Sequence, residues 1–253
     1  HELRTPLTLI LGPIKQLLEE NTQTKNHLQK DKFDLINQNA NRLLNLVNQV
    51  LDFRKAQSGE LKLKVSKTNI VALTKNIFHS FQELAEDKKI HFNYISENDF
   101  IEGYVDKDKY DKMLYNLLSN AFKFTPKYGN VDLFISKQKS NNLSSLIIEV
   151  SDDGIGIPKA SQEKVFSRFY QAKNSKVNNT GSGIGLSLVK ALVQLHKGSI
   201  SVQSEPDKGS SFTVKIPINR TAYQEQEVFE YDNKQVFKAS PQITTVNKII
   251  QGT

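Results

Sequence analysis

Two stretches within the first 57 residues carry hydrophobic side chains at alternating gaps of four and three, the spacing of one buried helix face. The two faces consist of Leu3, Leu7, Ile10, Ile14 and Leu17, and of Ile36, Ala40, Leu43, Val47 and Val50. A polar segment at 21–30 separates them, and Asp31 is suited to cap the second helix. Residues 1–57 therefore predict a helical hairpin. Because Leu44 and Leu51 would stay partly exposed in one hairpin, we expect two hairpins to pair as a homodimeric four-helix bundle.

Residues 58–219 carry the hydrophobic patterns of both strands and helices. Strands are predicted at 61–65, 90–95, 100–105, 131–136, 146–151, 199–204 and 211–217, and helices at 70–84, 108–124, 161–169 and 182–196. Thr68 or Asn69 can cap the first of these helices. The alternation predicts an α/β sandwich, in which a helical layer covers one mixed sheet. The whole chain is thus expected to be α + α/β, with a polar linker or tail at 220–253.

Composition narrows the possible functions. The 253 residues include no cysteine, so disulfides and thiolate metal sites are excluded. The net charge of +7 suits an anionic ligand, but the lysines are scattered, and no basic block indicates nucleic acid binding. No apolar run approaches the length of a membrane span, so we expect no direct membrane insertion by this part of the chain.

His1 is a candidate nucleophile at the head of the first helix. It lies two residues before the seam position Leu3, so its ring is expected to face solvent. An exposed imidazole is mostly neutral near pH 7, and one ring nitrogen then keeps a lone pair. The alternative for the hairpin is a coiled-coil spacer that has no chemistry, and the segment around His1 disfavours it.

The predicted helix at 108–124 has a polar stripe beside its apolar face. Asn116, Asn120 and Lys123 follow one another at gaps of four and three, so their side chains share one side of the helix. Amide oxygens suit Mg²⁺, and a lysine beside them can neutralise phosphate charge. The apolar face is expected to consist of Met113, Leu117, Ala121 and Phe124.

Two glycine-rich turns provide places where backbone can approach a ligand. The turn at 151–158 follows a predicted strand, and Asp152 at that strand end can accept a hydrogen bond from an exocyclic amine. The cluster at 180–187 opens a helix, whose N–H groups can hold anionic phosphates. A polar loop precedes that cluster, which disfavours a dinucleotide-binding Rossmann fold, and the chain contains no P-loop.

Taken together, these motifs resemble those of a known family. The segment His1-Glu-Leu-Arg-Thr-Pro6 resembles the phosphoacceptor box of sensor histidine kinases. The segments 116–126, 152–158, 165–170 and 181–187 resemble, in order, the N, G1, F and G2 boxes of the Bergerat-type ATP-binding domain in these kinases. Hsp90-, gyrase- and MutL-like ATPases share that domain. The resemblance covers residues 1 to about 218, nearly the whole chain.

The resemblance implies roles for individual residues. His1 would accept the γ-phosphoryl group of ATP, Glu2 would polarise its ring, and Thr5 would help water to dephosphorylate a partner receiver domain. Asn120, supported by Asn116, would hold Mg²⁺. The other residues implied to bind the nucleotide are Lys123, Phe124, Asp152, Gly154, Gly156, Ile157, Arg168, Lys173, Gly181, Gly183, Ile184, Gly185 and Leu186.

One position departs from the family pattern. Many relatives carry arginine directly after the Phe-Tyr pair of the F box, where this chain has Gln171. Arg168, Lys173 or Lys176 could take the place of that cation. The polar loop at 171–182 is expected to be a lid over ATP.

The resemblance implies ATP-dependent autophosphorylation of a histidine and transfer of the phosphoryl group to an aspartate of a receiver domain. The chain starts at the acceptor itself, so an upstream sensor is expected, with this part forming the cytoplasmic portion of a membrane-anchored protein. A hybrid kinase would carry its receiver beyond the tail. The alternatives are an ATPase or protein serine kinase of the same fold, or a nucleotide-sensing dimer scaffold without transfer activity.

Overall fold

The structure is a computed structural model, and it describes residues 9–14, 33, 36–37, 39–40, 43–44, 47–48, 50–51, 54–55, 58–140, 143–171 and 183–229. The chain divides into two compact units. One consists of His1–Asp52 and Lys238–Thr253, and the other of Phe53–Phe237. Helices and a mixed sheet thus occur in the order that the sequence predicts.

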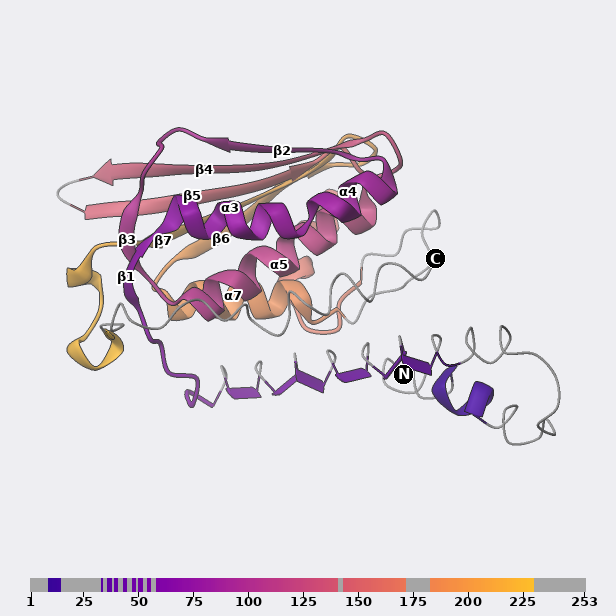
Figure 1. The fold of residues 1–253 in the computed structure, drawn as a ribbon, viewed down its shortest axis with the longest axis horizontal. Helices are drawn as coiled ribbons and strands as arrows, with labels where there is room; N and C mark the ends of the chain where they lie inside the picture. Colours follow the sequence, from indigo (N-terminus) through magenta and orange to yellow (C-terminus); the bar gives the residue numbers. More distant parts are fainter. Residues whose placement is uncertain are drawn as a thin grey trace. The chain divides into compact units, whose positions relative to one another are not determined.

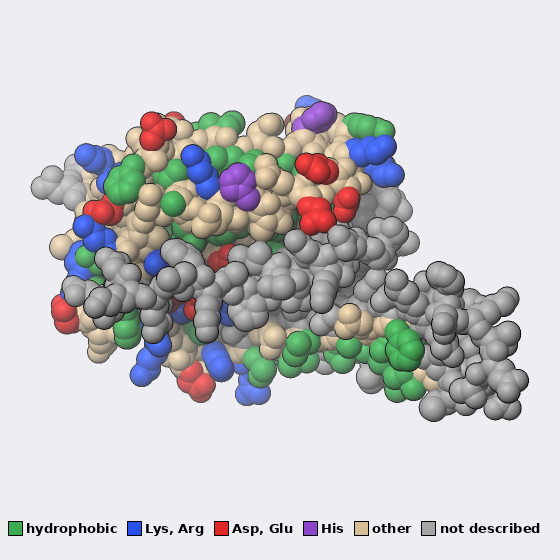
Figure 2. Space-filling view, viewed as in Figure 1, with side chains coloured by type: hydrophobic (Ala, Val, Ile, Leu, Met, Phe, Trp, Pro, Cys, Tyr) green, Lys and Arg blue, Asp and Glu red, His purple; other side chains and the backbone are tan. Residues whose placement is uncertain are grey.

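The first unit is helical wherever the structure describes it. Residues 9–14 and all described residues between 33 and 51 are in α-helix. Leu44 and Leu51 are 56% and 49% exposed, as expected for a single hairpin. Figure 2 shows hydrophobic side chains following one another along this unit. Covering this exposed row is what the predicted pairing of two hairpins would achieve.

The second unit is built on a five-stranded sheet. Its strand order is β2 (His91–Ser96), β4 (Asn130–Ser140), β5 (Leu143–Asp152), β7 (Gly209–Pro217) and β6 (Ser199–Glu205). β2 pairs with β4 in parallel and all other neighbours are antiparallel, so the sheet is mixed.

The domain also contains a two-stranded sheet, which the sequence pattern does not predict. It pairs β1 (Ser66–Asn69) antiparallel with β3 (Glu102–Val105). The strand predicted at 61–65 is therefore displaced, because regular pairing begins only at Ser66. Val65 makes an isolated bridge with Val228 instead.

The helices cover one face of the large sheet, and α3, α5 and α7 lie side by side on it (Figure 1). The helical segments are α3 (Ile70–Ser80), α4 (Gln82–Lys88), α5 (Lys107–Phe124), α6 (Lys159–Gln162), η1 (Lys164–Phe166), α7 (Gly185–Leu195), η2 (Arg220–Ala222) and η3 (Glu225–Glu227). Asn69 caps α3, since its side chain accepts from the Ala72 N–H at 3.2 Å. The helix predicted at 70–84 divides into α3 and α4 at Phe81.

The core between α5 and the sheet corrects one sequence prediction. Met113, Leu117 and Ala121 are buried as expected, but Phe124 is only half-buried. Phe122 is the buried aromatic residue, at 1% exposure. A second row on α5, containing Leu114, Leu118 and Phe122, is buried alongside the first. The broad sheet and α3 cover more of the helix surface than a single stripe requires.

Aromatic rings surround Phe122. Its ring stacks on Phe81 with centroids 5.6 Å apart and meets Phe92 edge to face at 5.0 Å.

Within the described ranges, no helix combines the length and apolar character needed to cross a membrane.

We expect Phe122→Ala to lower the free energy of unfolding by about 3–5 kcal/mol, because it empties a fully enclosed site between α5 and the sheet. Phe100→Ala is the matched control, since Phe100 is 59% exposed and its loss should change stability by less than about 1 kcal/mol. Urea denaturation of both variants measures the difference. Equal losses would contradict the packing described.

Candidate nucleotide-binding site

The N-terminal cap of α5 and the buried face of the helix determine where its polar stripe lies. Asp106 caps α5, because its Oδ1 accepts from the Lys109 N–H at 3.2 Å. With the apolar rows buried, the stripe of Asn116, Asn120 and Lys123 falls at the edge of the core, and all three side chains are half-buried. This degree of burial suits side chains that border a ligand site.

The start of α7 lies against one end of the stripe. A Cβ added at Gly185 would come within 2.8 Å of the Asn116 Oδ1. The Asn116 Nδ2 donates to the Lys112 carbonyl at 2.7 Å, so the amide oxygen is the end that faces α7. The N-cap of α7 is Ile184, and its first turn has no acidic residue. This helix start therefore suits an anionic ligand.

The glycine turn that follows β5 lies against the other end of the stripe. The Ile155 N–H donates to the Phe124 carbonyl at 3.4 Å. A Cβ at Gly154 would lie 2.4 Å from the same carbonyl oxygen, so only glycine allows this approach. The Lys123 Nζ lies 4.6 Å from the centroid of the Phe124 ring. The Phe124 backbone thus meets the turn, while its half-buried ring lies beside Lys123.

Asp152, at the end of β5, has an unusual protonation equilibrium. Burial, with a smaller contribution from the neighbouring Asp153 carboxylate, raises its pKa to about 6. The backbone N–H groups of Gly154 and Ser210 oppose this shift by donating to the carboxylate, the Gly154 bond being 3.0 Å long. Above pH 6 the group is an acceptor that can bind an amine.

The hairpin between β6 and β7 supports the same turn. The Ile157 N–H donates to the Ser204 Oγ at 2.7 Å, and the Gln162 side chain donates to the carbonyls of Ile157 and Ser204 at 3.0 and 2.6 Å. Gly156 has φ +65°, and a Cβ there would lie 2.0 Å from the Glu205 carbonyl oxygen. This close contact holds residues 155–157 in place beside α5.

Asp153 adds a second support. Its two carboxylate oxygens accept from the backbone N–H and side-chain amide of Asn130, at 2.8 and 2.7 Å. Sequence reasoning missed Ser204, Gln162, Ser210 and the Asn130–Asp153 pair. Most of these contacts join residues far apart in the chain, and no motif spacing signals them.

The F-box segment meets the beginning of α7. The Phe169 N–H donates to the Gly183 carbonyl at 2.9 Å, and Phe169 adopts φ 56°. The Tyr170 hydroxyl donates to the Ser161 Oγ at 2.9 Å, which ties the segment to α6. Arg168 is exposed on this turn.

The fold therefore gathers parts of all four motifs around one stripe of α5. Ile184 is buried at 5% exposure, whereas Ile157 and Leu186 are half-buried. His1, Glu2, Thr5, Lys173, Lys176 and Gly181 lie outside the described residues. In the described ranges, no group of three or more His, Asp or Glu could hold a metal ion. A divalent cation at this site would depend on amide oxygens such as that of Asn120, together with phosphate oxygens, which is a combination that fits Mg²⁺.

Two family profiles match the chain. The family described as "Histidine kinase-, DNA gyrase B-, and HSP90-like ATPase" matches residues 105–220. The family described as "His Kinase A (phospho-acceptor) domain" matches residues 1–59. The first match contains the site just described, and the second contains His1.

The individual relatives that match the chain are histidine kinases by name. The chain is 38% identical over 232 residues to Histidine kinase P4 of Formosa agariphila, covering 90% of this chain and 16% of that protein. It is 39% identical over 220 residues to Sensor histidine kinase TmoS of Ectopseudomonas mendocina, covering 87% and 22%. The solved structure of full-length ShkA in complex with AMPPNP matches with a TM-score of 0.66 and 26% identity, over 87% of this chain and 44% of that one. The chain thus spans less than a quarter of the length of the two curated relatives.

We expect Asp152→Asn to weaken ATP binding about tenfold to a hundredfold, because an amide places a donor where a charged acceptor is needed. Asp111→Asn is the matched control. Burial, with Asp108 nearby, raises the pKa of Asp111 to about 6 as well. Asp111 lies one helical turn before Tyr115, and the Tyr115 ring packs on Phe81 at the end of α3. Asp111 is therefore on a different side of α5 from the polar stripe, and Asp111→Asn should bind ATP normally. Calorimetric titration with ATP measures both affinities, and equal weakening would contradict the assignment.

The same two variants test the pKa shift through stability. The pKa of each carboxyl group is raised from 3.8 in the unfolded chain to about 6 in the folded protein. Protonation of the group therefore stabilises the folded protein, and this stabilisation is complete below pH 3.8 and lost as the pH rises through about 6. Each asparagine variant should therefore be more stable than the parent by about 1–3 kcal/mol at pH 7.5. This gain should shrink as the pH falls toward 4, as urea denaturation at several pH values would show. A gain that is constant with pH would contradict the shift.

We expect Gly156→Ala to disrupt the turn and lower ATP affinity for two reasons. The new Cβ would clash with the Glu205 backbone, and alanine is strained at the positive φ of this position. Gly59→Ala is a control that separates these effects. Gly59 has φ +72° with nothing within 4 Å of an added Cβ, so only the backbone strain of about 1 kcal/mol applies. ATP titrations and melting curves of the two variants measure the difference. Equal losses of ATP affinity and of melting temperature in Gly156→Ala and Gly59→Ala would contradict the close contact with Glu205.

Proposed function

We propose that this chain, which belongs to the sensor histidine kinases and comprises their catalytic core, uses ATP to phosphorylate His1 and then passes the phosphoryl group to an aspartate of a receiver domain. The observation that carries the proposal is the arrangement along α5. One glycine turn meets Asn116 through Gly185, and another meets Phe124 through Gly154. Asn120 and Lys123 lie between these contacts.

We assign the purine end of ATP to the G1 side of this arrangement. Asp152 accepts from the exocyclic amine, Phe124 borders the base, and Gly154, Gly156 and Ile157 form the supporting turn. The phosphates lie toward α7, where the dipole and N–H groups at the helix start attract negative charge. The residues assigned to this end are Asn116, Asn120, Lys123, Gly181, Gly183, Ile184, Gly185 and Leu186. Asn120 and Asn116 would hold a Mg²⁺ ion, which would supply charge neutralisation for the phosphates.

His1 acts as the nucleophile in the transfer step. Its neutral ring nitrogen attacks the γ-phosphorus, the bond from that phosphorus to the β–γ bridging oxygen breaks, and ADP leaves. Glu2 accepts a hydrogen bond from the other ring N–H and stabilises the positive charge that develops there. A receiver aspartate then attacks the phosphohistidine and regenerates His1. Thr5 orients the water that hydrolyses the aspartyl phosphate of the receiver, which is a separate reaction that releases inorganic phosphate.

The γ-phosphate also needs a cation, because Gln171 stands where many relatives have arginine. Arg168, exposed on the F-box turn, is one candidate, and Lys173 and Lys176 are the others. Replacing each by glutamine in turn identifies the residue. Its loss should lower the transfer rate more than it lowers ATP affinity.

The same proposal covers partners and location. The exposed hydrophobic row of the helical unit is suited to a homodimeric four-helix bundle. The receiver domain is either a separate protein or fused beyond the tail. The chain is assigned to the cytoplasmic portion of a longer, membrane-anchored sensor.

We expect γ-labelled ATP and Mg²⁺ to label the protein when it is expressed with an N-terminal extension that continues its first helix. The label should be acid-labile and absent from His1→Gln, because only phosphohistidine combines both properties. Asn120→Ala should also lose the label while keeping the parent's unfolding curve, as a metal-binding residue would.

The other outcomes identify the alternatives. Acid-stable label that survives His1→Gln would indicate a protein serine kinase. Free phosphate without labelled protein would indicate an ATPase. ATP binding with neither product would indicate a nucleotide-sensing scaffold.

A further inference from the structure

The imidazole of His196 lies between two helices of the candidate site, and the chemistry proposed above does not use it. The residue is fully buried and occupies the C-cap of α7. Its Nδ1 lies 2.8 Å from the Leu192 carbonyl oxygen, and its Nε2 accepts from the Asp106 backbone N–H at 3.3 Å. Asp106 is the N-cap of α5. One ring therefore joins the end of α7 to the start of α5.

The two partners of the His196 ring determine which of its nitrogens carries the proton. A carbonyl oxygen only accepts and a backbone N–H only donates, so the ring is neutral with its proton on Nδ1. Burial lowers the pKa of His196. The charges of Asp106, Lys109 and Glu227 act on this pKa with opposite signs and do not reverse its direction.

Asp106, to which the ring is attached, is itself held in place. Its Oδ1 accepts from the Lys109 N–H at 3.2 Å, and its Oδ2 accepts from the Lys109 ammonium at 2.6 Å and from the Lys64 N–H at 2.8 Å. The His196 ring is therefore bonded to a backbone position that three other hydrogen bonds already define.

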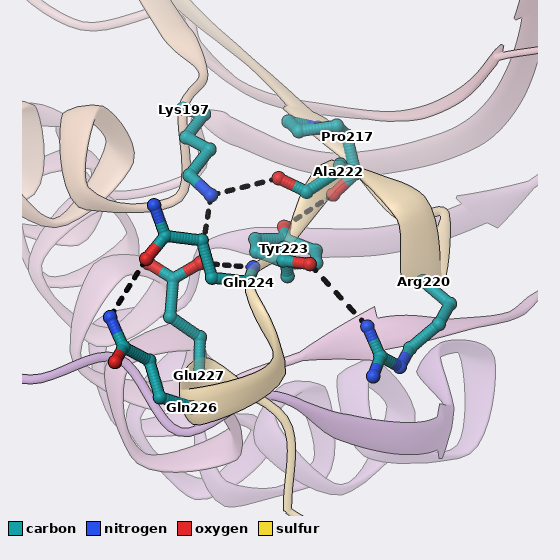
Figure 3. A network of polar contacts seen from close by, with 8 residues as sticks. All are labelled: Lys197, Pro217, Arg220, Ala222, Tyr223, Gln224, Gln226 and Glu227. Atoms are coloured by element: carbon teal, nitrogen blue, oxygen red, sulfur yellow. Dashed lines mark hydrogen bonds and ion pairs between the residues drawn. The ribbon is translucent and has the colours of Figure 1, made fainter.

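The turn that follows the ring is held by residues 219–229 (Figure 3). The Lys197 ammonium donates to the Ala222 carbonyl and to the Glu227 carboxylate, both at 2.8 Å. The same carboxylate accepts from the Gln224 N–H at 2.7 Å. The last turn of α7 is thus fastened to two neighbours, which are α5 and this segment.

Residues 219–229 are firmly attached to the domain. Composition predicts a polar tail from residue 220, yet Tyr223 is only 4% exposed and packs with Leu63 and Val65 on the linker that joins the two units. The Val65 N–H donates to the Glu227 carbonyl, and the Phe229 N–H donates to the Val65 carbonyl, both at 2.8 Å. Lys197 therefore ties α7 to a fixed part of the domain.

The two helices meet a second time at the nucleotide site, where Gly185 approaches the Asn116 Oδ1. With a rise of about 1.5 Å per residue, Gly185 and His196 lie about 16 Å apart along α7, and Asp106 and Asn116 lie about 15 Å apart along α5. The helices therefore run antiparallel and touch near both ends of α7 (Figure 1). Both belong to the same compact unit. Because a helix keeps its length, the link at one end of α7 determines where its other end lies along α5.

We infer that His196 is a positioning residue for the phosphate end of the site. It fixes α7 along α5 and thereby keeps the N–H groups at the start of α7 in line with the asparagines of the polar stripe. The inference rests on the proposed function, because that function places the phosphates of ATP at this helix start. The purine end is built from β5, the G1 turn and the hairpin of β6 and β7. Loss of the ring therefore weakens binding of the phosphates and leaves purine binding unchanged.

The test compares His196→Leu with Tyr110→Phe. Leucine fills much of the space of the ring but leaves the buried Asp106 N–H without an acceptor. Tyr110 is fully buried on α5, and its hydroxyl lies 2.6 Å from the Thr74 Oγ1 of α3. Both variants lose a buried hydrogen bond of α5, but only His196→Leu loses the one to α7.

We expect His196→Leu to bind ATP about fivefold to tenfold more weakly, because losing one buried hydrogen bond lowers the fraction of molecules with α7 in place by about this factor. The affinity for adenosine should not change, so the preference for ATP over adenosine falls equally. Tyr110→Phe should keep both affinities. His196→Gln should restore most of the preference, because its amide offers both an acceptor and a donor. Calorimetric titrations with ATP and Mg²⁺, and with adenosine, measure these affinities below the melting temperature of each variant.

Three results would overturn the inference. They are an unchanged preference for ATP in His196→Leu, an equal fall of that preference in Tyr110→Phe, and a glutamine variant that binds no better than the leucine variant. Failure of the proposed function would look different, because the parent protein itself would then form no phosphohistidine.

A second measurement on the parent protein needs no variant and applies even if His196→Leu does not fold. Nitrogen-15 spectra of the imidazole rings should show His196 neutral at pH 7, with its proton on Nδ1, and the Asp106 amide should exchange slowly with solvent. A proton on Nε2, or exchange of this amide at the rate of an exposed one, would overturn the link between the helices.

Discussion

The site depends on how α5 is buried. Two rows of apolar side chains on this helix pack against the sheet and its neighbouring helices, which leaves one polar stripe at the margin of the core. The Asp106 cap determines where the helix begins, and the helical repeat then determines where Asn116, Asn120 and Lys123 point. Because the two glycine turns contact opposite ends of this stripe, a rotation of α5 would displace every part of the candidate site at once.

The acceptor at the G1 turn shows a conflict between stability and binding. Asp152 is buried enough for its pKa to rise to about 6, so its charged form destabilises the folded protein near neutral pH. Two backbone N–H groups partly offset this penalty. A carboxylate retained under these conditions is typical of a binding or catalytic position, where charge serves the ligand better than it serves the fold.

The segment at 219–229 shows that polar composition is a poor guide to where a domain ends. Residues 219–229 contain few hydrophobic side chains, yet one tyrosine, one valine and a set of backbone bonds are enough to attach them. The hydrophobic cluster around Tyr223 consists of other residues than the core beneath the sheet. It lies where the linker enters the domain, so the first and last residues of the domain stabilise each other.

The sequence by itself determined those features that depend on neighbouring residues. Periodicity located the long helices and most strands of the second unit, but the helix predicted at 161–169 was wrong, because only α6 and the short η1 turn form there. Asn69 was among the expected caps, and the spacing of 116, 120 and 123 predicted the polar stripe. The glycine turns and the order of the motifs indicated the family. Only the tertiary structure decided that Phe122 and not Phe124 enters the core, that Ser204 and Gln162 support the G1 turn, and that Tyr223 packs on Leu63. Each of these features is a contact between surfaces that meet only in the folded chain, and hydrophobic or polar character alone does not specify which partner a side chain will meet.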